Sequence, residues 1–289
     1  MAVPLPVAHL NGRFLPLAEA HLSPLDRGFL FGDGVYEVIP AYGGRLFHLP
    51  GHLKRLQHSL DGIRLKNPLN DPEWSALLKE LVTKNGGGDQ AVYLQVSRGA
   101  DVGRDHGFPA KAPATVFAMS SPLDPLPDEL KHRGARVITL QDIRWQRCDI
   151  KCTALLGNVL LRQQAIEAGC HEGLLLRNGH VTEGTASGLF IVEDGVLVTP
   201  PDSPELLPSI TRDAVLMLAA RIHMPMRRDV IPIGALERAE EIWLVSSTRE
   251  VYAVTSVDGR PVRDGKPGVQ WQRMYALFQE HKAERVAYE

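Results

Sequence analysis

The alternation of hydrophobic and polar positions in the first 120 residues predicts several short strands. Apolar stretches on either side of Asn11-Gly12 indicate a β-hairpin, because this pair favours the two-residue turn of tightly connected strands. Residues 35–42 have the composition of a strand that turns back at Gly43-Gly44. Residues 91–97 and 114–119 predict two further strands.

Between these strands the hydrophobic period changes to that of an amphipathic helix. The leucines that predict a first helix, which also carries Arg55, are Leu49, Leu53, Leu56 and Leu60. A second helix follows the capping sequence Asp71-Pro72-Glu73, and its expected buried face is Trp74, Leu77, Leu78 and Leu81. Strands and helices together predict a small α+β domain over residues 1–119.

Residues 120–130 contain three prolines and no hydrophobic period, so we expect a linker there. The larger domain should then cover residues 131–289. A strand is expected at 135–140, a helix from about Thr153 to Ala168, a helix start near Ile210, a strand at 241–246 and a terminal helix. Hairpin turns are expected at Asn178-Gly179, Asp194-Gly195 and Asp258-Gly259. Because hairpins outnumber βαβ units, we expect mainly antiparallel sheets and a barrel-like or sandwich-like second domain.

Composition narrows the class of protein without identifying it. The 289 residues carry a formal net charge of −2, which gives no general attraction to nucleic acid or to an anionic membrane surface. The N-terminal sequence lacks the features of a secretory signal, and no apolar run reaches membrane-spanning length. Cys148, Cys152 and Cys170 are too few for a disulfide framework and have no partners for a zinc site. We expect reduced, mostly buried thiols at Cys148 and Cys152, no metal site, and a cytoplasmic protein.

Several common motifs are incomplete in this chain. Gly32-x-Gly34 is followed by Glu37 where a dinucleotide fingerprint needs its third glycine. The serine of the sequence from Gly184 to Gly188 stands one place too late for a nucleophile elbow. His48 and His52 have the spacing of a metal pair, but Pro50-Gly51 between them disfavours a shared helix face.

One lysine differs from the other eight in its surroundings. Lys151 follows the strand-like residues 147–150 and precedes an apolar helix, so its amine should be partly desolvated. Desolvation lowers the pKa of an amine and favours a nucleophile. A lysine that extends from a helix start into solvent fits the position equally well. Position alone therefore leaves both interpretations open.

Two later segments are candidate anion sites. Residues 209–213 stand at an expected helix N-terminus, where unpaired N–H groups and the helix dipole favour phosphate. Ser246 and Ser247 stand at a strand end and supply hydroxyl and N–H donors. Glu183 lies on the far strand of the hairpin at Asn178-Gly179.

Nearly end to end, the chain resembles the fold-type IV aminotransferases that depend on pyridoxal 5′-phosphate, specifically the bacterial D-amino-acid transaminases. The segments that carry the resemblance appear in the family's order: residues 26–28, 31–38, 142–145, 147–151, 182–184 and 210–213. The resemblance implies a small α+β domain beside a larger β-rich domain, in a homodimer with shared active sites. It also implies transamination of D-amino acids such as D-alanine with 2-oxo acids such as 2-oxoglutarate or pyruvate.

The resemblance assigns roles to individual residues. Lys151 forms the internal aldimine and moves the Cα proton, and Glu183 pairs with the pyridine nitrogen to keep it protonated. Leu207 packs against the ring, and the phosphate ligands are Arg55, Ile210, Thr211, Ser246 and Ser247. Tyr36, Arg104 and His106 hold the substrate carboxylate, the last two from the polar loop at residues 99–109.

This sequence departs from the family at three positions near these roles. Ala186 and Gly188 replace a serine and an asparagine, and Pro40 replaces a basic residue. Three activities of the same fold are alternatives: branched-chain L-amino-acid aminotransferase, (R)-amine transaminase and aminodeoxychorismate lyase. A cofactor-binding regulatory or storage protein without turnover is the alternative from another class.

Overall fold

The computed structural model describes residues 3–101 and 103–284, so Met1, Ala2, Val102 and residues 285–289, which fall in segments considered above, lie outside the described residues. The chain forms two compact units. The first contains the described residues up to Asp124 together with Ile150–Leu155 and Glu284, and the second contains Pro125–Asp149 and Leu156–Ala283. The boundary falls within residues 120–130. Lys151, however, belongs to the first unit and not to the larger domain in which it was expected.

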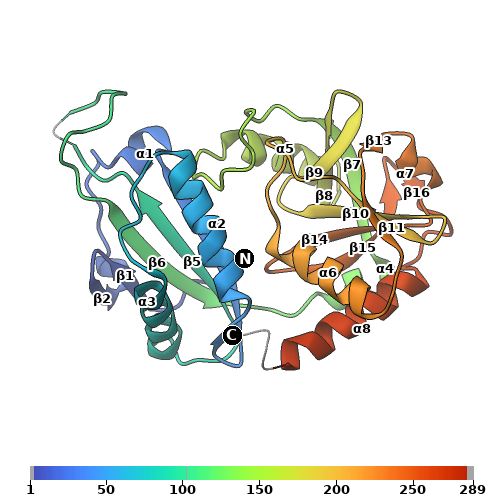
Figure 1. Ribbon diagram of the computed structural model, residues 1–289, viewed down its shortest axis with the longest axis horizontal. Helices are drawn as coiled ribbons and strands as arrows, with labels where there is room; N and C mark the ends of the chain where they lie inside the picture. Colours follow the sequence, from blue (N-terminus) through green and yellow to red (C-terminus); the bar gives the residue numbers. More distant parts are fainter. Residues whose placement is uncertain (1–2, 102, 285–289) are drawn as a thin grey trace. The chain divides into compact units, whose positions relative to one another are not determined.

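The first unit is built on a six-stranded antiparallel sheet with strand order β2-β1-β6-β5-β3-β4. Its strands are β1 (Val7–Leu10), β2 (Arg13–Pro16), β3 (Gly34–Tyr42), β4 (Arg45–Leu46), β5 (Gln90–Ser97) and β6 (Thr115–Pro122). Its helices are η1 (Leu17–Glu19), α1 (Arg27–Phe31), α2 (Leu49–Gly62) and α3 (Asp71–Lys84). Helices α2 and α3 pack on this sheet (Figure 1), and they bury the leucines expected from the helical period.

The second unit contains a ten-stranded curled sheet with strand order β12-β11-β10-β14-β15-β7-β8-β9-β13, in which β16 also pairs with β15. Its strands are β7 (Ala135–Gln141), β8 (Glu172–Arg177), β9 (His180–Gly184), β10 (Gly188–Glu193), β11 (Val196–Thr199), β12 (Met226–Arg228), β13 (Ile231–Pro232), β14 (Glu241–Ser246), β15 (Glu250–Val257) and β16 (Arg260–Pro261). Its helices are α4 (Asp128–Arg133), α5 (Leu156–Glu167), α6 (Ile210–Arg221), α7 (Ala235–Arg238) and α8 (Val269–Ala283). Most pairings are antiparallel, but three are parallel: β7–β8, β7–β15 and β11–β12. The α+β class is confirmed.

The five expected turns are present, including Gly43-Gly44 between β3 and β4. In the other four, both turn residues also have positive φ: Asn11-Gly12, Asn178-Gly179, Asp194-Gly195 and Asp258-Gly259. A two-residue turn with positive φ at both positions matches the twist of the strands, and asparagine, aspartate and glycine adopt it at low cost. These four turns join β1 to β2, β8 to β9, β10 to β11 and β15 to β16.

Two element starts differ from the sequence prediction. Helix α3 is capped by Asn70, whose side chain accepts a hydrogen bond from Glu73 N–H while the Glu73 side chain accepts one from Asn70 N–H. Helix α5 begins at Leu156, and the residues before Lys151 form a loop rather than a strand. Thr153 N–H and Oγ1–H both donate to main-chain carbonyls of residues 32–34, and these bonds hold Thr153 in the irregular segment before the helix.

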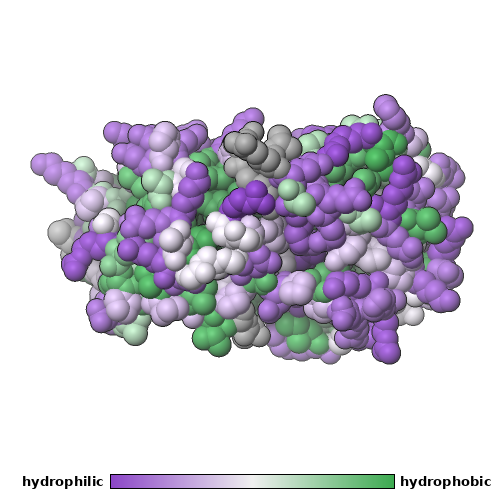
Figure 2. Space-filling view, turned by 90° about the horizontal axis from the view of Figure 1, so that it is seen from below, coloured by the Kyte–Doolittle hydropathy of each residue, from purple (hydrophilic) through white to green (hydrophobic). Residues whose placement is uncertain are grey.

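Hydrophilic side chains dominate the face of the molecule in Figure 2, with smaller hydrophobic patches between them. Among the described residues, the helices are all too short or too polar to cross a membrane. All three cysteines are free, and Cys148 and Cys152 are buried as expected. Burial raises the pKa of both thiols, which keeps them protonated and unreactive.

Candidate active site

Lys151 lies in an irregular segment that runs beside β3. Tyr36 N–H donates to the Lys151 carbonyl at 2.9 Å, and Lys151 N–H donates to Ser59 Oγ of α2 at 3.1 Å. A short bridge pairs Cys152 with Val35 of the same strand. The main chain of the lysine is therefore fixed to a strand and a helix of the first unit.

The Lys151 side chain is half-buried, and its Nζ atom lies 4.2 Å from the centroid of the Tyr36 ring. An ammonium group over an aromatic face is held by the negative charge of the ring face, a contact of about 0.5–2 kcal/mol. Tyr36 in turn stacks on Tyr93 with 5.7 Å between ring centroids. The amine is thus partly desolvated, and Tyr36 fixes its position.

A buried ion pair lies on the opposite face of β3. Arg55 donates from Nε to Glu37 Oε1 at 2.8 Å and from Nη2 to Glu37 Oε2 at 2.7 Å, and His52 Nδ1 lies 2.8 Å from Oε2. Burial alone would raise the pKa of Glu37, but the charge and hydrogen bonds of Arg55 dominate and lower it to about 2. Burial lowers the pKa of His52, so its neutral ring donates from Nδ1 to the carboxylate.

Arg55 was expected to bind the cofactor phosphate. It is 7% exposed, and its guanidinium is oriented by Glu37. A bidentate pair fixes the plane of the guanidinium as well as its position. The role of Arg55 toward phosphate stays a prediction.

The other two residues expected at the substrate lie on an exposed loop of the first unit. The Arg104 guanidinium lies 5.2 Å from the centroid of the Phe31 ring, and the His106 ring contacts the same phenylalanine edge to face, also at 5.2 Å. Both side chains are exposed. Arg104 and His106 therefore both lie against Phe31, at the end of α1.

In the second unit, Glu183 lies near the end of β9 and is 6% exposed. Arg144 Nη1 donates to Glu183 Oε1 at 2.6 Å, and Leu207 N–H donates to the same carboxylate at 3.2 and 3.3 Å. Asp142 holds Arg144 with two hydrogen bonds of 2.9 Å and also accepts one from Arg177. Burial raises the pKa of Glu183, while Arg144 and the Leu207 N–H oppose that shift.

The two candidate anion segments of the second unit lie in one neighbourhood. Helix α6 packs against β10 and β14, and a Cβ added to Gly188 at the start of β10 would lie 3.5 Å from Ser209 Oγ. Ser209 caps α6 by accepting a hydrogen bond from Arg212 N–H, so Ile210 and Thr211 occupy the first helical turn. Gly188 pairs with Val245, next to Ser246 at the end of β14. The N-terminus of α6 and the end of β14 thus both lie beside Gly188, and they offer hydroxyl and N–H donors of the kind that bind an anion.

Residues 34–257 match the family Amino-transferase class IV. The chain belongs to this family. It is 39% identical over 258 residues to the D-alanine aminotransferase of Bacillus licheniformis, covering 89% of this chain and 90% of that protein. It is 35% identical over 273 residues to the D-alanine aminotransferase of Staphylococcus aureus strain COL, covering 94% and 96%.

Solved structures of class IV aminotransferases share this fold. The Escherichia coli branched-chain amino acid aminotransferase superposes with a TM-score of 0.92 at 26% identity, covering 97% of both chains. A second branched-chain amino acid aminotransferase, from T.th. and with pyridoxamine 5′-phosphate, gives a TM-score of 0.91 at 28% identity, covering 96% and 94%. Class IV aminotransferases depend on pyridoxal 5′-phosphate.

The donor set of this chain fits that cofactor. A phosphate matches the N–H groups and hydroxyls at α6 and Ser246, and a protonated pyridine nitrogen matches a buried carboxylate such as Glu183. Glu183 Oε2 accepts only the 3.2 Å contact from Leu207 among the described residues, which leaves acceptor capacity on that oxygen. The main chain at Gly188 is closely packed, because a Cβ added there would lie 3.2 Å from Val245 Cγ2.

Four residues that orient the expected site residues were not predicted from the sequence. Glu37 and His52 hold Arg55, while Asp142 and Arg144 hold Glu183. For Glu37 the sequence held one signal. Glu37 lies two positions from both Val35 and Ile39 along the strand, so all three side chains share one buried face. A charge on an apolar strand face needs a buried partner.

Proposed function

We propose that this class IV aminotransferase transfers amino groups between D-amino acids and 2-oxo acids, with pyridoxal 5′-phosphate as cofactor. The observation that carries the proposal is the half-buried Lys151 amine over Tyr36, on a main chain bonded to β3 and α2. The D-amino-acid part is supported by relatives at 34–39% identity that are named D-alanine aminotransferase.

The residues divide the work between cofactor and substrate. When bound, the cofactor supplies an electron sink for the pair left on the substrate Cα. Lys151 Nζ would bind the cofactor covalently. Once released, the free amine would take the proton from Cα as general base and deliver it as general acid to the cofactor carbon to which Lys151 had been bound. Glu183 keeps the pyridine nitrogen protonated, and Arg144 holds that carboxylate in place. Leu207 packs against the ring, and the phosphate ligands are Arg55, Ile210, Thr211, Ser246 and Ser247.

Substrate recognition rests on Arg104, His106 and Tyr36. An arginine fork can hold a carboxylate through two parallel hydrogen bonds, and the histidine and tyrosine add further donors. With the carboxylate and the amino nitrogen both fixed, only one enantiomer presents its Cα–H to Lys151. The position of the carboxylate site therefore decides which enantiomer reacts, and the relatives named D-alanine aminotransferase support the D form.

Branched-chain L-amino-acid transfer is the second candidate, because the solved structures with TM-scores of 0.91 and 0.92 carry that name. A panel of D- and L-amino acids with 2-oxoglutarate as acceptor separates the two. D-Alanine turnover without L-leucine turnover supports the proposal, and the reverse preference contradicts it. An (R)-amine transaminase would instead accept amines that lack a carboxylate, and an aminodeoxychorismate lyase would form product without any 2-oxo acid.

We also propose a cytoplasmic homodimer in which the partner chain completes each active site. Helix α5 supports a protein interface, because its exposed side chains include Leu156 at 71%, Val159 at 58% and Leu160 at 48%. Apolar residues at this spacing form one stripe on the helix. The three free cysteines support the cytoplasmic part of this proposal. Light scattering during dilution tests the dimer, and a fully active monomer would contradict it.

A further inference from the structure

The loop that carries Arg104 and His106 is held by its main chain. Arg27 Nη1 donates to the Asp105 carbonyl at 2.6 Å, and Arg27 Nη2 donates to the His106 carbonyl at 3.2 Å. One guanidinium thus fixes two successive carbonyl groups. The peptide planes on either side of His106 are set by these bonds, and Arg104 directly precedes them in the chain.

Arg27 is itself held in a buried cluster of two arginines and one aspartate. Arg27 Nε donates to Asp33 Oδ2 at 2.8 Å, while Arg98 donates to both oxygens of Asp33 at 2.8 and 3.0 Å. Arg27 is 3% exposed and Arg98 6%. The single carboxylate leaves one positive charge uncompensated within the cluster, and loop carbonyls are good acceptors for it.

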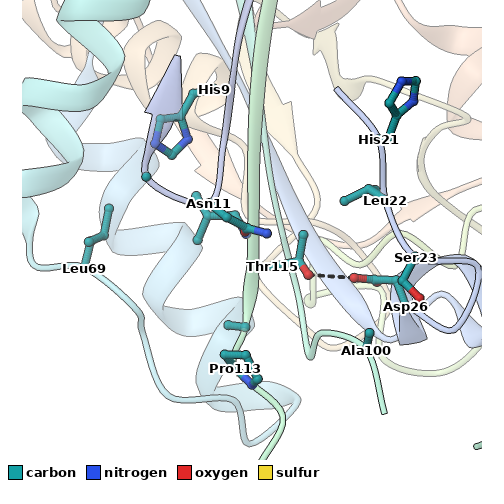
Figure 3. Close-up of a pocket in the computed structure, with 13 residues that line it drawn as sticks. His9, Asn11, His21, Leu22, Ser23, Asp26, Leu69, Ala100, Pro113 and Thr115 are labelled. Atoms are coloured by element: carbon teal, nitrogen blue, oxygen red, sulfur yellow. Dashed lines mark hydrogen bonds between the residues drawn. The ribbon is translucent and has the colours of Figure 1, made fainter. Parts of the chain in front are cut away.

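Asp26 fixes the start of α1, where Arg27 is the first residue. The Asp26 carboxylate, 2% exposed, accepts hydrogen bonds from Gly28 N–H, Ser97 Oγ and Thr115 Oγ1 at 2.8, 2.7 and 2.6 Å. The last of these is drawn in Figure 3, at a cavity of ≈ 500 Å³ that Asp26 and Thr115 help to line. Asp26 thus caps α1 and ties it to β5 and β6, so Arg27 projects from a rigid base.

The same short helix also supports the side chains of the loop. Phe31, one turn after Arg27, contacts both Arg104 and His106. Further along, Phe108 lies under Arg98 at 3.8 Å from guanidinium to ring centroid. Helix α1 and Arg98 thus anchor the loop through both its main chain and its rings.

From these contacts we infer that Arg27, oriented by Asp33, is a positioning residue for the substrate-carboxylate site. By holding the carbonyls of Asp105 and His106, it fixes the main chain from which the Arg104 and His106 side chains project. This inference rests on the proposed function, since it assumes that the loop binds the substrate carboxylate. A loop containing Gly103 and Gly107 has many accessible conformations, and holding it in one of them lowers the entropic cost of binding.

The test is Arg27→Met, which keeps the length and packing of the side chain but removes the guanidinium. The KM values for D-alanine and 2-oxoglutarate should rise together by roughly 10- to 100-fold, with a much smaller change in kcat. Arg27→Lys keeps the charge but cannot hold two carbonyls as a fork, so it should fall between the wild type and Arg27→Met. If Arg27→Met does not fold, the KM values of Arg27→Lys still test the inference. Arg13→Met, a surface arginine on β2, is the matched control.

Amide hydrogen exchange gives a readout that is independent of activity. Exchange at residues 103–109 should accelerate in Arg27→Met, while exchange in β5 and β6 stays as in the wild type. In a background of Arg104→Ala with His106→Ala, adding Arg27→Met should change KM little, since Arg27 acts through those side chains. Unchanged KM values, unchanged loop exchange or a full effect in that background would each overturn the inference. A wild type that does not turn over D-alanine would overturn the proposed function instead, and hydrogen exchange would still decide whether Arg27 anchors the loop.

Discussion

Glu37 and Arg55 form a bidentate ion pair inside the first unit, joining β3 to α2 through contacts of 2.7 and 2.8 Å. Both side chains are buried, at 0% and 7% exposure. The pair holds the Arg55 guanidinium in one orientation without any bound phosphate. Because Lys151 is bonded to both of the same elements, the pair also stabilises the frame around the lysine.

Replacing Glu37 with glutamine should destabilise the protein by about 3–5 kcal/mol at pH 7, because Arg55 would remain buried without its counter-charge. The pKa of Glu37 is lowered to about 2, so its stabilising effect is complete above the unfolded value near 4.5 and is lost as the pH falls toward 2. Thermal unfolding from pH 5 downward should show the wild type approaching Glu37→Gln, since protonated glutamate resembles glutamine. A difference that is constant over this range would contradict the depressed pKa.

This pair shows what the sequence could and could not predict. Local rules predicted α2 from the period of its leucines and four hairpins from their Asn-Gly and Asp-Gly pairs. The structure has both turn residues at positive φ in each of these hairpins. The start of α5 was misplaced, because bonds to residues 32–34, more than a hundred positions away in the chain, hold Thr153 in an irregular segment. The partners of Arg55 and Glu183 were missed although they are nearer in the chain, with 18 positions between Arg55 and Glu37 and 39 between Glu183 and Arg144. Contacts between separate elements depend on how those elements pack, and no local period encodes them.

Lys151 should carry the covalent bond to the cofactor. Its main chain is fixed on both sides, and its half-buried Nζ is directed over Tyr36. Borohydride reduction of the loaded enzyme followed by peptide mapping should place the pyridoxyl group on the peptide that contains Lys151, and Lys151→Ala should abolish the label. Lys54→Ala, on the surface of α2, should leave it unchanged. A label on another lysine would remove Lys151 from the mechanism.

Glu183→Gln should retain the cofactor and lose turnover by roughly 10²–10⁴-fold, the usual cost of removing a positioned acid–base or electrostatic group. Glutamine keeps a hydrogen-bonding group but cannot hold a ring nitrogen in its protonated form. Glu193→Gln, on β10 of the same sheet and paired with Arg227, is the matched control and should be active. Absorbance measures cofactor content, and stopped-flow or steady-state assays measure turnover. Near-normal turnover in Glu183→Gln would show that another group serves the ring nitrogen.

Arg104→Ala tests the origin of D-specificity directly. The Arg104 side chain is exposed and rests on Phe31, so its loss should leave the fold and the cofactor absorbance unchanged. Losing one charged bidentate contact costs about 1.5–3 kcal/mol, which corresponds to an increase in KM of roughly 10- to 150-fold. Because amino donor and 2-oxo acceptor share a carboxylate, the KM values for D-alanine and 2-oxoglutarate should rise together. Arg104→Lys keeps the charge without the fork, so it should recover only part of the loss. If both KM values stay unchanged, the loop does not bind the carboxylate. If the wild type prefers L-leucine, the branched-chain activity replaces the D-specific one, since this fold would then hold its substrate in the opposite sense relative to Lys151.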